Sequence, residues 1–310
     1  MVSGEGKIRG DLIRKEAFNL GFDLIGIVPL RQLDEHKEHL HSWLDKKMNA
    51  DMFFLSRDKD KRTDPRKLFP GANSVIVTGL NYFPPILQDG DLPLISKYAY
   101  GEDYHFVIKE KLRKLLDFII SLDPSATGKI CVDSSPVLEK AWAHEAGLGW
   151  IGKNSLLINR ERGSFIFLGE IFLNIDLESY TQVQPDYCGN CSLCIETCPT
   201  GAINDNRTID AGKCISWLTI ERKSEIPDEF RGKLKNRIFG CDICQDICPW
   251  NNGITPHKTD QFRISDDVRK MSLEEWKNLT SEKFEKLFRR SPLKRAGYKK
   301  ITDNIKFVTD

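Results

Sequence analysis

The fold is decided by the stretch Cys188-Gly189-Asn190-Cys191-Ser192-Leu193-Cys194-Ile195-Glu196-Thr197-Cys198-Pro199, in the second half of a chain of 310 residues. Its spacing, C-x2-C-x2-C-x3-C-P, is typical of bacterial ferredoxins, in which the first three thiolates ligate one iron–sulfur cubane and the fourth ligates another. The run from Cys241 to Pro249 repeats this pattern without its first Cys. Counting back from Cys241 places the missing ligand at Ile238, and Cys214 is the only other Cys nearby, so we assign it that role.

This count predicts two 4Fe–4S clusters with complete ligand sets. The first cluster takes Cys188, Cys191, Cys194 and Cys248, and the second takes Cys198, Cys214, Cys241 and Cys244. Structural zinc is the main alternative, but zinc sites usually have paired C-x2-C knuckles rather than three Cys followed by Cys-Pro. Disulfides would require an oxidising compartment.

The overall composition gives no general argument for a nucleic-acid partner. The 46 Lys and Arg against 45 Asp and Glu leave a net charge of +1, so any such argument must be local. The start, Met1 to Lys15, has no apolar segment typical of a signal peptide, and no apolar run approaches the ~18 residues of a membrane span. Because eight of the nine Cys lie between 188 and 248, we expect reduced thiols in the cytoplasm and no membrane partner.

Hydrophobic periodicity predicts alternating helices and strands in the first part of the chain. We expect helices over residues 7–20, 34–48 and 105–121, and strands over 22–28, 74–80 and 129–132. This alternation predicts an α/β first domain. No GxGxxG motif follows a strand and no P-loop is present, so neither a Rossmann dinucleotide site nor a Walker nucleotide site is indicated.

Three local patterns refine this prediction. Ser135-Pro136 is a typical helix start, with Ser as the cap and Pro in the first turn. The turn over 159–163 predicts a hairpin between 156–158 and 164–175. The charged stretch over 56–67 is expected to be a solvated loop for most of its charged residues.

The predicted organisation has three parts. Residues 1–178 form the α/β domain, residues 179–258 a ferredoxin-like α+β domain with two clusters, and residues 259–310 a short helical tail. The tail is basic, with nine Lys or Arg between 283 and 306 against Glu285 and Asp303. Either this is a solvated helix face or it contacts a phosphate backbone.

Two adjacent cubanes form a short wire for single electrons. A free ferredoxin needs only the cluster domain, whereas here some 180 residues precede it. We therefore expect the two clusters to transfer electrons to a site in the first domain, where a second cofactor performs the organic chemistry.

Four phrases resemble those of epoxyqueuosine reductases, and the resemblance runs from about residue 10 to 305. They are Tyr98-Ala99-Tyr100-Gly101-Glu102-Asp103-Tyr104-His105, Val132-Asp133-Ser134-Ser135-Pro136-Val137-Leu138-Glu139, Gly149-Trp150-Ile151-Gly152-Lys153-Asn154 and Phe239-Gly240-Cys241-Asp242-Ile243-Cys244-Gln245-Asp246-Ile247-Cys248-Pro249-Trp250-Asn251. The resemblance implies an α/β cobalamin-binding domain followed by the two-cluster domain. It also implies reduction of epoxyqueuosine to queuosine at the wobble base of tRNA. Many members have further helical repeats, which this short form is expected to lack.

The resemblance also implies roles for individual residues. Asp133 matches the family's proton-donating acid. Such an acid is needed because the leaving epoxide oxygen must receive a proton. Without the resemblance, Asp133 would be interpreted as a helix cap at the end of a strand. We expect this acid to be held protonated by an enclosed pocket that disfavours its charged form. The corrin pocket is expected to include Arg57, Asp133, Lys153, Ser216, Cys241 and Asp242.

The residues expected to contact the substrate and the tRNA are indicated less specifically than those of the corrin pocket. Tyr104 and His105 are expected to line the substrate pocket, with a packed aromatic and a helix-start His as alternatives. Arg222 and Lys223 are candidates for RNA phosphate contacts. Cys131 receives no role, because a lone Cys beside a strand is usually part of the core.

Two other functions fit the cysteines. A corrinoid reductive dehalogenase is usually exported with a twin-arginine signal, which is absent here, and would not need the basic tail. A ferredoxin-type electron-transfer subunit would have clusters but bind no corrin. We expect a monomer that binds tRNA and receives electrons from an external donor.

Overall fold

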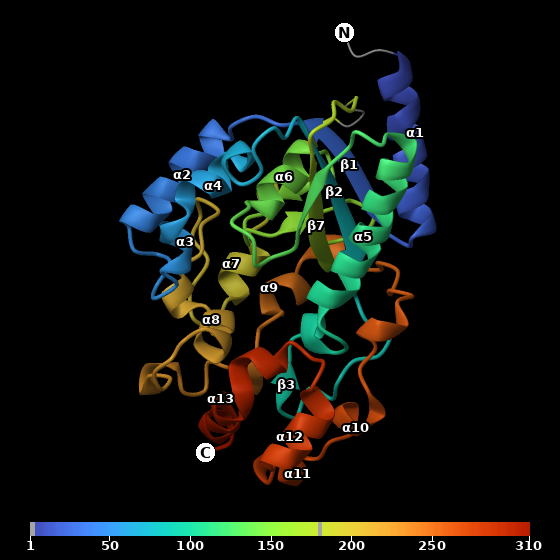
Figure 1. Ribbon diagram of the computed structural model, residues 1–310. Helices are drawn as coiled ribbons and strands as arrows, with labels where there is room; N and C mark the ends of the chain where they lie inside the picture. Colours follow the sequence, from blue (N-terminus) through green and yellow to red (C-terminus); the bar gives the residue numbers. More distant parts are fainter. Residues whose placement is uncertain (1–3, 179–181) are drawn as a thin grey trace.

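The computed structural model describes residues 4–178 and 182–310, and a four-stranded sheet with helices on both faces lies at its centre (Figure 1). The strand order is β1-β2-β7-β4, with bounds Leu24–Pro29, Ser74–Asn81, Ile166–Leu173 and Gly128–Cys131 respectively. Each neighbouring pair is antiparallel. The three predicted strands and the alternation of helices with strands are confirmed.

Two apolar cores lie on opposite faces of this sheet. All residues of β2 are buried, and in β7 only the first is not, because both faces of these central strands are covered. Helices α1 (Gly4–Asn19) and α5 (Tyr104–Leu122) cover one face. Helix α6 (Glu139–Glu145) covers the other with Trp142. The close approach of α5 needs Gly169, where a Cβ atom would lie 2.7 Å from the Ile108 side chain.

The predicted hairpin between 156–158 and 164–175 is wrong. The turn exists as an isolated bridge between Asn159 and Gly163, but β6 (Leu157–Ile158) pairs with β5 (Trp150–Ile151). Strand β7 pairs instead with β2 and β4. The apolar side chains of β7 on both faces favour a central position in the large sheet over an exposed two-stranded ribbon.

The predicted helix start at Ser135-Pro136 is also wrong. Helix α6 begins at Glu139, and its N-cap residue Leu138 makes no side-chain cap. Before it, the chain turns tightly, with hydrogen bonds from Ser134 N to Val132 O and from Val137 N to Ser135 O. These local turns leave 133–138 free to line a cavity instead of a helix.

Most charged side chains of the stretch 56–67 are exposed, as expected, but its backbone is not a loop. It folds into α3 (Phe54–Arg57), α4 (Lys59–Thr63) and a 3₁₀ turn at Pro65–Lys67. Arg62 and Asp64 are buried within it. Two hydrogen bonds help to accommodate these buried side chains: Asp64 accepts from Arg66, and Arg62 donates to the carbonyl of Phe54.

The cluster region packs against α2 (Asp34–Asp45) and the loop after it. Trp43 donates to the carbonyl of Ile209, and Trp217 donates to Asp51, both at 2.8 Å. The elements of this region are short: α7 (Leu193–Thr197), α8 (Ile215–Ile220), β8 (Arg237–Phe239) and α9 (Ile243–Asp246). The predicted boundary at 178/179 adjoins residues 179–181, which lie outside the described residues.

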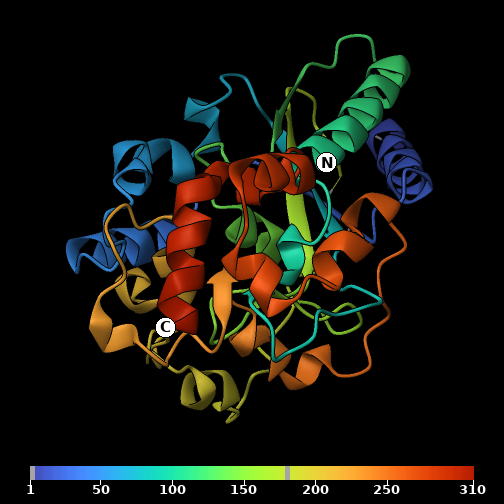
Figure 2. The same cartoon turned by 90° about the horizontal axis from the view of Figure 1, so that it is seen from below.

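The C-terminal segment is helical, as predicted, and packs firmly on the rest of the protein (Figure 2). Its helices are α10 (Asp266–Arg269), α11 (Leu273–Lys277), α12 (Ser281–Phe288) and α13 (Leu293–Thr309), the last broken at Gly297. Their apolar side chains share a core with β3 (Leu94–Ile95) and β8, which pair in parallel. Asn304 of α13 donates to the carbonyls of Thr219 and Ile238.

Short 3₁₀ turns complete the chain at Lys97–Ala99, Ala211–Lys213, Asp228–Phe230, Pro249–Asn251 and Asp260–Phe262. Across the described ranges, the search for a helix both long enough and apolar enough to cross a bilayer finds none.

Candidate active site

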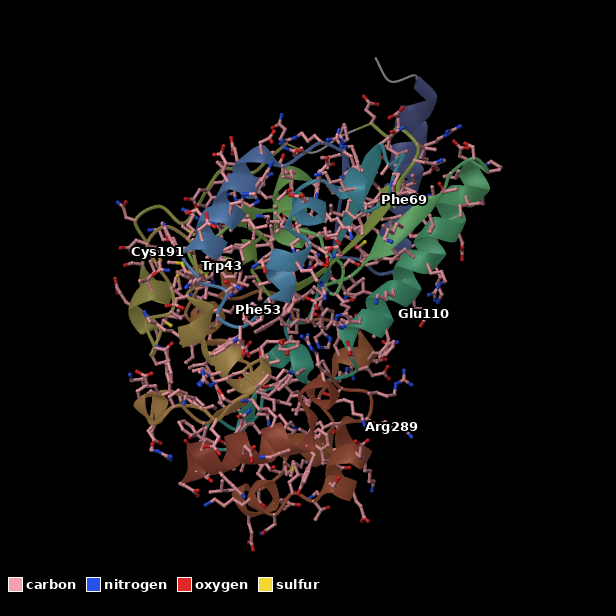
Figure 3. All side chains as sticks on the ribbon, turned by 60° about the vertical axis from the view of Figure 1, so that its left-hand side comes forward. Trp43, Phe53, Phe69, Glu110, Cys191 and Arg289 are labelled. Carbon is pink, nitrogen blue, oxygen red and sulfur yellow. The ribbon has the colours of Figure 1, made fainter. Side chains whose placement is uncertain are left out.

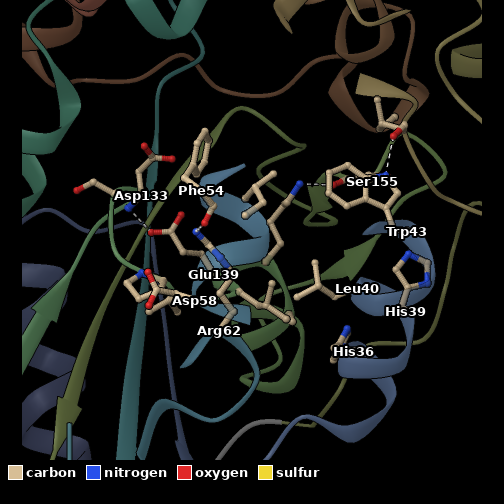
Figure 4. Close-up of a pocket in the computed structure, with 18 of the residues that line it drawn as sticks. His36, His39, Leu40, Trp43, Phe54, Asp58, Arg62, Asp133, Glu139 and Ser155 are labelled. Atoms are coloured by element: carbon tan, nitrogen blue, oxygen red, sulfur yellow. Dashed lines mark hydrogen bonds between the residues drawn. The ribbon is translucent and has the colours of Figure 1, made fainter. Parts of the chain in front are cut away.

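A cavity of about 800 Å³ lies between the first domain and the cluster region (Figure 4). Its apolar lining includes Leu40 and Trp43 of α2 and Phe54 of α3, the last of which lies beside Asp133 in Figure 4. Its polar lining includes Arg57, Arg62, His105, Asp133, Glu139 and Arg295. The cavity therefore combines a large apolar surface with a concentrated group of ionisable side chains, which is the usual character of a ligand site.

Asp133 lies directly after β4 in a strained backbone conformation. Its φ of 52° is in the left-handed region, which Asp tolerates better than most residues. Its N–H donates to the carboxylate of Glu139, and this bond holds the turn in place. Strained residues of this kind concentrate at functional sites, and here the strain aims the Asp133 carboxylate into the cavity.

His105 links Asp133 to a second carboxylate. Asp103 caps α5 by accepting from the His105 N–H at 3.0 Å. The same carboxylate lies 2.6 Å from Nδ1 of His105, and Asp133 Oδ2 lies 3.1 Å from Nε2. Both ring nitrogens therefore face an acceptor, and only a protonated imidazole donates to both. Behind the ring, Tyr104 stacks on His105 and on Phe167.

These contacts determine where the proton resides. Burial by itself would lower the pKa of His105, but its hydrogen bonds to the carboxylates of Asp103 and Asp133 outweigh burial and raise that pKa to about 9. Burial would raise the pKa of Asp133, but the hydrogen bond and charge of His105, with Arg295, lower it overall. The expectation of a protonated Asp133 at rest is therefore wrong, because its partner is an imidazolium and the proton resides on His105.

The His105 ion pair should make stability depend on pH. The pKa of His105 in the folded protein, about 9, exceeds its ordinary value of 6.5. The contribution of the ion pair to stability is therefore complete below pH 6.5 and is lost as the pH rises through about 9. We expect His105→Gln to lower the free energy of unfolding by about 1–2 kcal/mol at pH 6 and by much less above pH 9. The value at pH 6 takes into account that solvent screens the partly exposed Asp133. Urea unfolding across this range measures the difference.

The matched control for this experiment is His39→Gln. His39 is exposed and borders the same cavity, but it makes no ion pair in the described part of the chain. A difference between wild type and His105→Gln that stays constant from pH 6 to 10 would contradict the assigned ion pair.

The four thiols predicted for the second cluster face one another. Cys198, Cys214, Cys241 and Cys244 all line a single cavity of about 270 Å³. Burial raises the pKa of the Cys244 thiol, and the charges of Cys241 and Cys214 raise it further. A bound cluster would reverse this effect, because its iron ions stabilise thiolates.

The other four thiols include the exposed Cys191 and the buried Cys248. Burial raises the pKa of Cys248, and the charges of Cys188, Cys194 and Cys191 add to the effect. Trp150 donates to the Cys188 sulfur at 3.5 Å. Most of these interactions lie within one predicted ligand set, but Cys244 also interacts with Cys194 of the other set. Among the described residues, no three His, Cys, Asp or Glu side chains are grouped as they would be around a single metal ion, so the assignment depends on spacing and on these mutual interactions.

The two cavities adjoin. Lys140, Ser155 and Ile209 line both of them, and Lys140 donates to the carbonyl of Ser155 at 2.6 Å. A cluster held by Cys244 and its neighbours would therefore lie one wall of side chains from the cavity that contains Asp133.

The structure brings some predicted site residues together and separates others. Arg57, His105 and Asp133 line the large cavity, and Ser216 and Cys241 line the smaller one. Lys153 and Tyr104 line neither, although Tyr104 supports His105. Arg222 stacks on Trp217 outside both cavities, and Lys223 is exposed.

Asp242 has a different environment from the one expected. It is buried and accepts from the hydroxyl of Ser96 and from the backbone N–H of Lys97. The Lys97 ammonium lies 3.6 Å from Asp242 and 2.5 Å from Asp246. Asp242 therefore joins the cluster loop to the segment after β3 and does not line the large cavity.

Sequence reasoning did not assign Arg62, Glu139 and Lys140 to the site. Glu139 falls inside the phrase around Asp133, and its place three residues after Pro136 suggested only a helix. Arg62 was part of a stretch interpreted as a loop. Their shared position depends on α4 and α6 meeting at the cavity, for which no local signal exists.

Most basic residues of the C-terminal segment already have partners. Five of the nine form ion pairs: Lys283 with Glu275, Arg290 with Glu102, Lys294 with Glu285, Arg295 with Glu221, and Lys299 with Asp303. Lys300 donates to the carbonyl of Leu218. Arg289, which projects from this segment in Figure 3, is exposed. Arg295 and Glu221 together border the large cavity.

Comparison with known proteins identifies the family. Residues 62–134 match the model of epoxyqueuosine reductase QueG, and residues 187–251 match a 4Fe-4S double cluster binding domain. The epoxyqueuosine reductase of Cyclobacterium marinum is 46% identical over 299 residues, which cover 96% of each chain. That of Escherichia coli is 39% identical, with 94% of this chain and 78% of the relative covered.

Solved structures agree with this assignment. An epoxyqueuosine reductase crystallised with an epoxyqueuosine-modified tRNA-Tyr stem loop has a TM-score of 0.86 and 31% identity, covering 95% of this chain and 79% of that one. A Bacillus subtilis structure, described with its catalytic aspartate loop swung out of the active site, has a TM-score of 0.86, 30% identity and the same coverage. With relatives this similar along nearly its whole length, the chain belongs to the epoxyqueuosine reductase family.

Proposed function

We propose that this protein reduces the epoxide of epoxyqueuosine in tRNA to the alkene of queuosine. In this proposal cobalamin binds in the 800 Å³ cavity and two 4Fe–4S clusters carry electrons to it. The single observation that supports it most strongly is the shared wall of Lys140, Ser155 and Ile209, which puts four cluster thiols beside the cavity of Asp133. Electron delivery and proton delivery then meet at one place.

The cavity suits a corrin. Its volume of about 800 Å³ is near the upper end of the usual range for small-molecule sites. Trp43, Leu40 and Phe54 offer apolar surface to the macrocycle. Arg62 also borders the cavity, and its buried Nε has no hydrogen-bond partner among the described residues. Bound cobalamin would supply low-potential cobalt chemistry at the epoxide carbon.

Two sets of thiols would hold the clusters, with the assignments predicted from spacing. The set of Cys198, Cys214, Cys241 and Cys244 is adjacent to the cavity, so its cluster would be the last carrier before cobalamin. The set of Cys188, Cys191, Cys194 and Cys248 includes the exposed Cys191, so an external donor protein would approach from that side.

Asp133 and His105 would deliver a proton to the epoxide oxygen. As the C–O bond breaks, negative charge develops on that oxygen, and a positioned acid stabilises it by proton transfer. The imidazolium of His105 lies 3.1 Å from Asp133 Oδ2, so Asp133 would take the proton from His105 and pass it to the substrate. Arg57 and Arg295 add positive charge at the cavity.

The tRNA would approach with its anticodon loop over the cavity. Bases of a single-stranded loop leave their stack at low cost, and a related structure contains such a stem loop. The Arg57 and Arg295 side chains are 77% and 59% exposed, and both are positioned to meet phosphates. Arg222, Lys223 and Arg289 are further candidates. The enzyme would act as a monomer in the cytoplasm.

The direct test is a reaction with a defined substrate. Protein with reconstituted clusters and bound cobalamin is given an anticodon stem-loop containing epoxyqueuosine and a strong reductant. We expect the nucleoside to lose one oxygen atom by mass spectrometry, only when cobalamin and reductant are both present. Protein that contains iron and cobalamin yet leaves the nucleoside unchanged would refute the proposal.

A further inference from the structure

Glu170 is a glutamate at the centre of the large sheet to which the proposed mechanism gives no role. It lies on β7, between Val77 and Cys131 on the neighbouring strands, and is 0% exposed. Among the described residues, neither of its carboxyl oxygens finds a hydrogen-bond donor. A buried carboxylate without donors or a cation is very unfavourable, so this group must be neutral and carry a proton.

Helix α6, which carries Glu139, packs against β7, which carries Glu170, and the carboxyl of Glu139 is the partner with which Glu170 interacts most strongly. Glu139 accepts the N–H of Asp133 and borders the large cavity. Two carboxyls in contact cannot both be ionised. Burial, together with the charge of Asp133, raises the pKa of Glu139 to about 7, and burial raises that of Glu170 well above its ordinary value.

The charged groups around the pair do not remove this proton. His105 on α5 and Arg62 on α4 face Glu139 from the cavity side, and Asp133 faces it from the end of β4. Lys140, the next residue on α6, donates to the carbonyl of Ser155 instead. Cys131 and Tyr104 are neutral neighbours. No cation contacts Glu170 in the described part of the chain, so the pair retains one proton between two carboxyls.

The proposed reaction needs more protons than one acid holds. Conversion of an epoxide to an alkene consumes two electrons and two protons and releases one water. The first proton turns the epoxide oxygen into a hydroxyl as one C–O bond breaks. The second is taken up by the hydroxyl as the other C–O bond breaks, water leaves and the C=C bond forms. The electrons come from the clusters, and the His105–Asp133 pair accounts for the first proton.

We propose that the Glu139–Glu170 pair shares one proton and supplies the second proton of the reaction through the cavity face of Glu139. This inference depends on the proposed function for its role in the reaction. Glu170 is the buried store, Glu139 is the residue that reaches the cavity, and the hydrogen bond from Asp133 N holds Glu139 in place. After transfer the pair has one negative charge, and it is neutralised again by a proton from cavity water.

The test uses Glu170→Gln in the cluster-reconstituted protein. Gln keeps the shape and a donor toward Glu139 but has no proton to transfer. Infrared spectroscopy of wild type at pH 7 should show the carbonyl band of a protonated buried carboxylic acid, and this band should be absent from Glu170→Gln. With cobalamin and substrate, we expect a single-turnover rate lower by about 10–100-fold, unchanged tRNA affinity, and an alkaline limb of the pH profile moved to lower pH.

Two further variants complete the experiment. Glu139→Gln, at the cavity edge, should show the same kinetic loss and serves if Glu170→Gln does not fold. Glu161→Gln, on an exposed turn, is the matched control and should behave as wild type.

Three outcomes separate this inference from the proposed function. An infrared spectrum of wild type without the acid band would overturn the shared proton, whatever the activity. Variants with wild-type rate and pH profile would overturn the role in catalysis, provided that wild type reduces epoxyqueuosine. If wild type leaves epoxyqueuosine intact, the proposed function and the catalytic role of the pair are both wrong. The infrared carbonyl band would still show whether the Glu139–Glu170 pair holds a proton.

Discussion

Cys214→Ser is expected to remove one iron–sulfur cluster and leave turnover undetectable. Wild type reconstituted anaerobically should contain about eight iron and eight sulfide per chain, and the variant about four of each. Cys214 lies with three other thiols around the 270 Å³ cavity next to the candidate active site. Loss of its cluster would interrupt the electron path at the last carrier. Iron and sulfide analysis, with multiple-turnover assays on the modified stem-loop, measures both effects.

The matched control is Cys131→Ser. Cys131 is the one cysteine outside the predicted ligand sets and is buried in the sheet, so its replacement should leave both clusters in place. Equal iron loss in the two variants would refute the ligand assignment. Zinc in place of iron after anaerobic purification would refute the clusters themselves.

Asp133→Asn is expected to lower the single-turnover rate by about 10²–10⁴-fold, the usual contribution of a general acid. Asn tolerates the left-handed conformation of Asp133, φ 52°, so the turn and its hydrogen bond to Glu139 should survive. The variant should therefore retain both clusters, cobalamin and tRNA affinity. Asp133→Ala should be no less impaired, because it adds backbone strain to the lost acid.

Asp117→Asn, on the exposed face of α5, is the control for this measurement. A wild-type rate in Asp133→Asn would mean that the proton reaches the substrate from His105 or Tyr104 without Asp133. Loss of cobalamin binding in the variant would instead make Asp133 a structural residue of the pocket, and the acid role would fall.

Local sequence was sufficient for the parts of the protein whose geometry is local. Three thiolates at x2 spacing wrap one cluster by themselves, so the first ligand run needs no knowledge of the fold. The strand over 74–80 and the helix over 105–121 were predictable for the same reason, because their apolar side chains repeat with the period of the element. The phrase around Asp133 suggested a proton-donating acid there by resemblance alone, and this role stays a prediction.

Pairing between strands was decided by the tertiary structure. The segments 156–158 and 164–175 are neighbours in sequence and joined by a good turn, yet β7 pairs with β2 and β4. A turn signal reports only that two strands can meet. Which partner is chosen depends on how much apolar surface each arrangement buries, and this sum includes helices far away in sequence.

The protonation states of the site residues also could not be predicted from the sequence. Asp133 follows a strand and precedes a Ser-Pro pair, which says nothing of His105, 28 positions earlier. Glu139 and Glu170 are 31 positions apart in sequence, and each alone is an ordinary glutamate. Desolvation and charge act through space over a few ångströms, so the pKa of a side chain becomes defined only when the fold has brought its neighbours together.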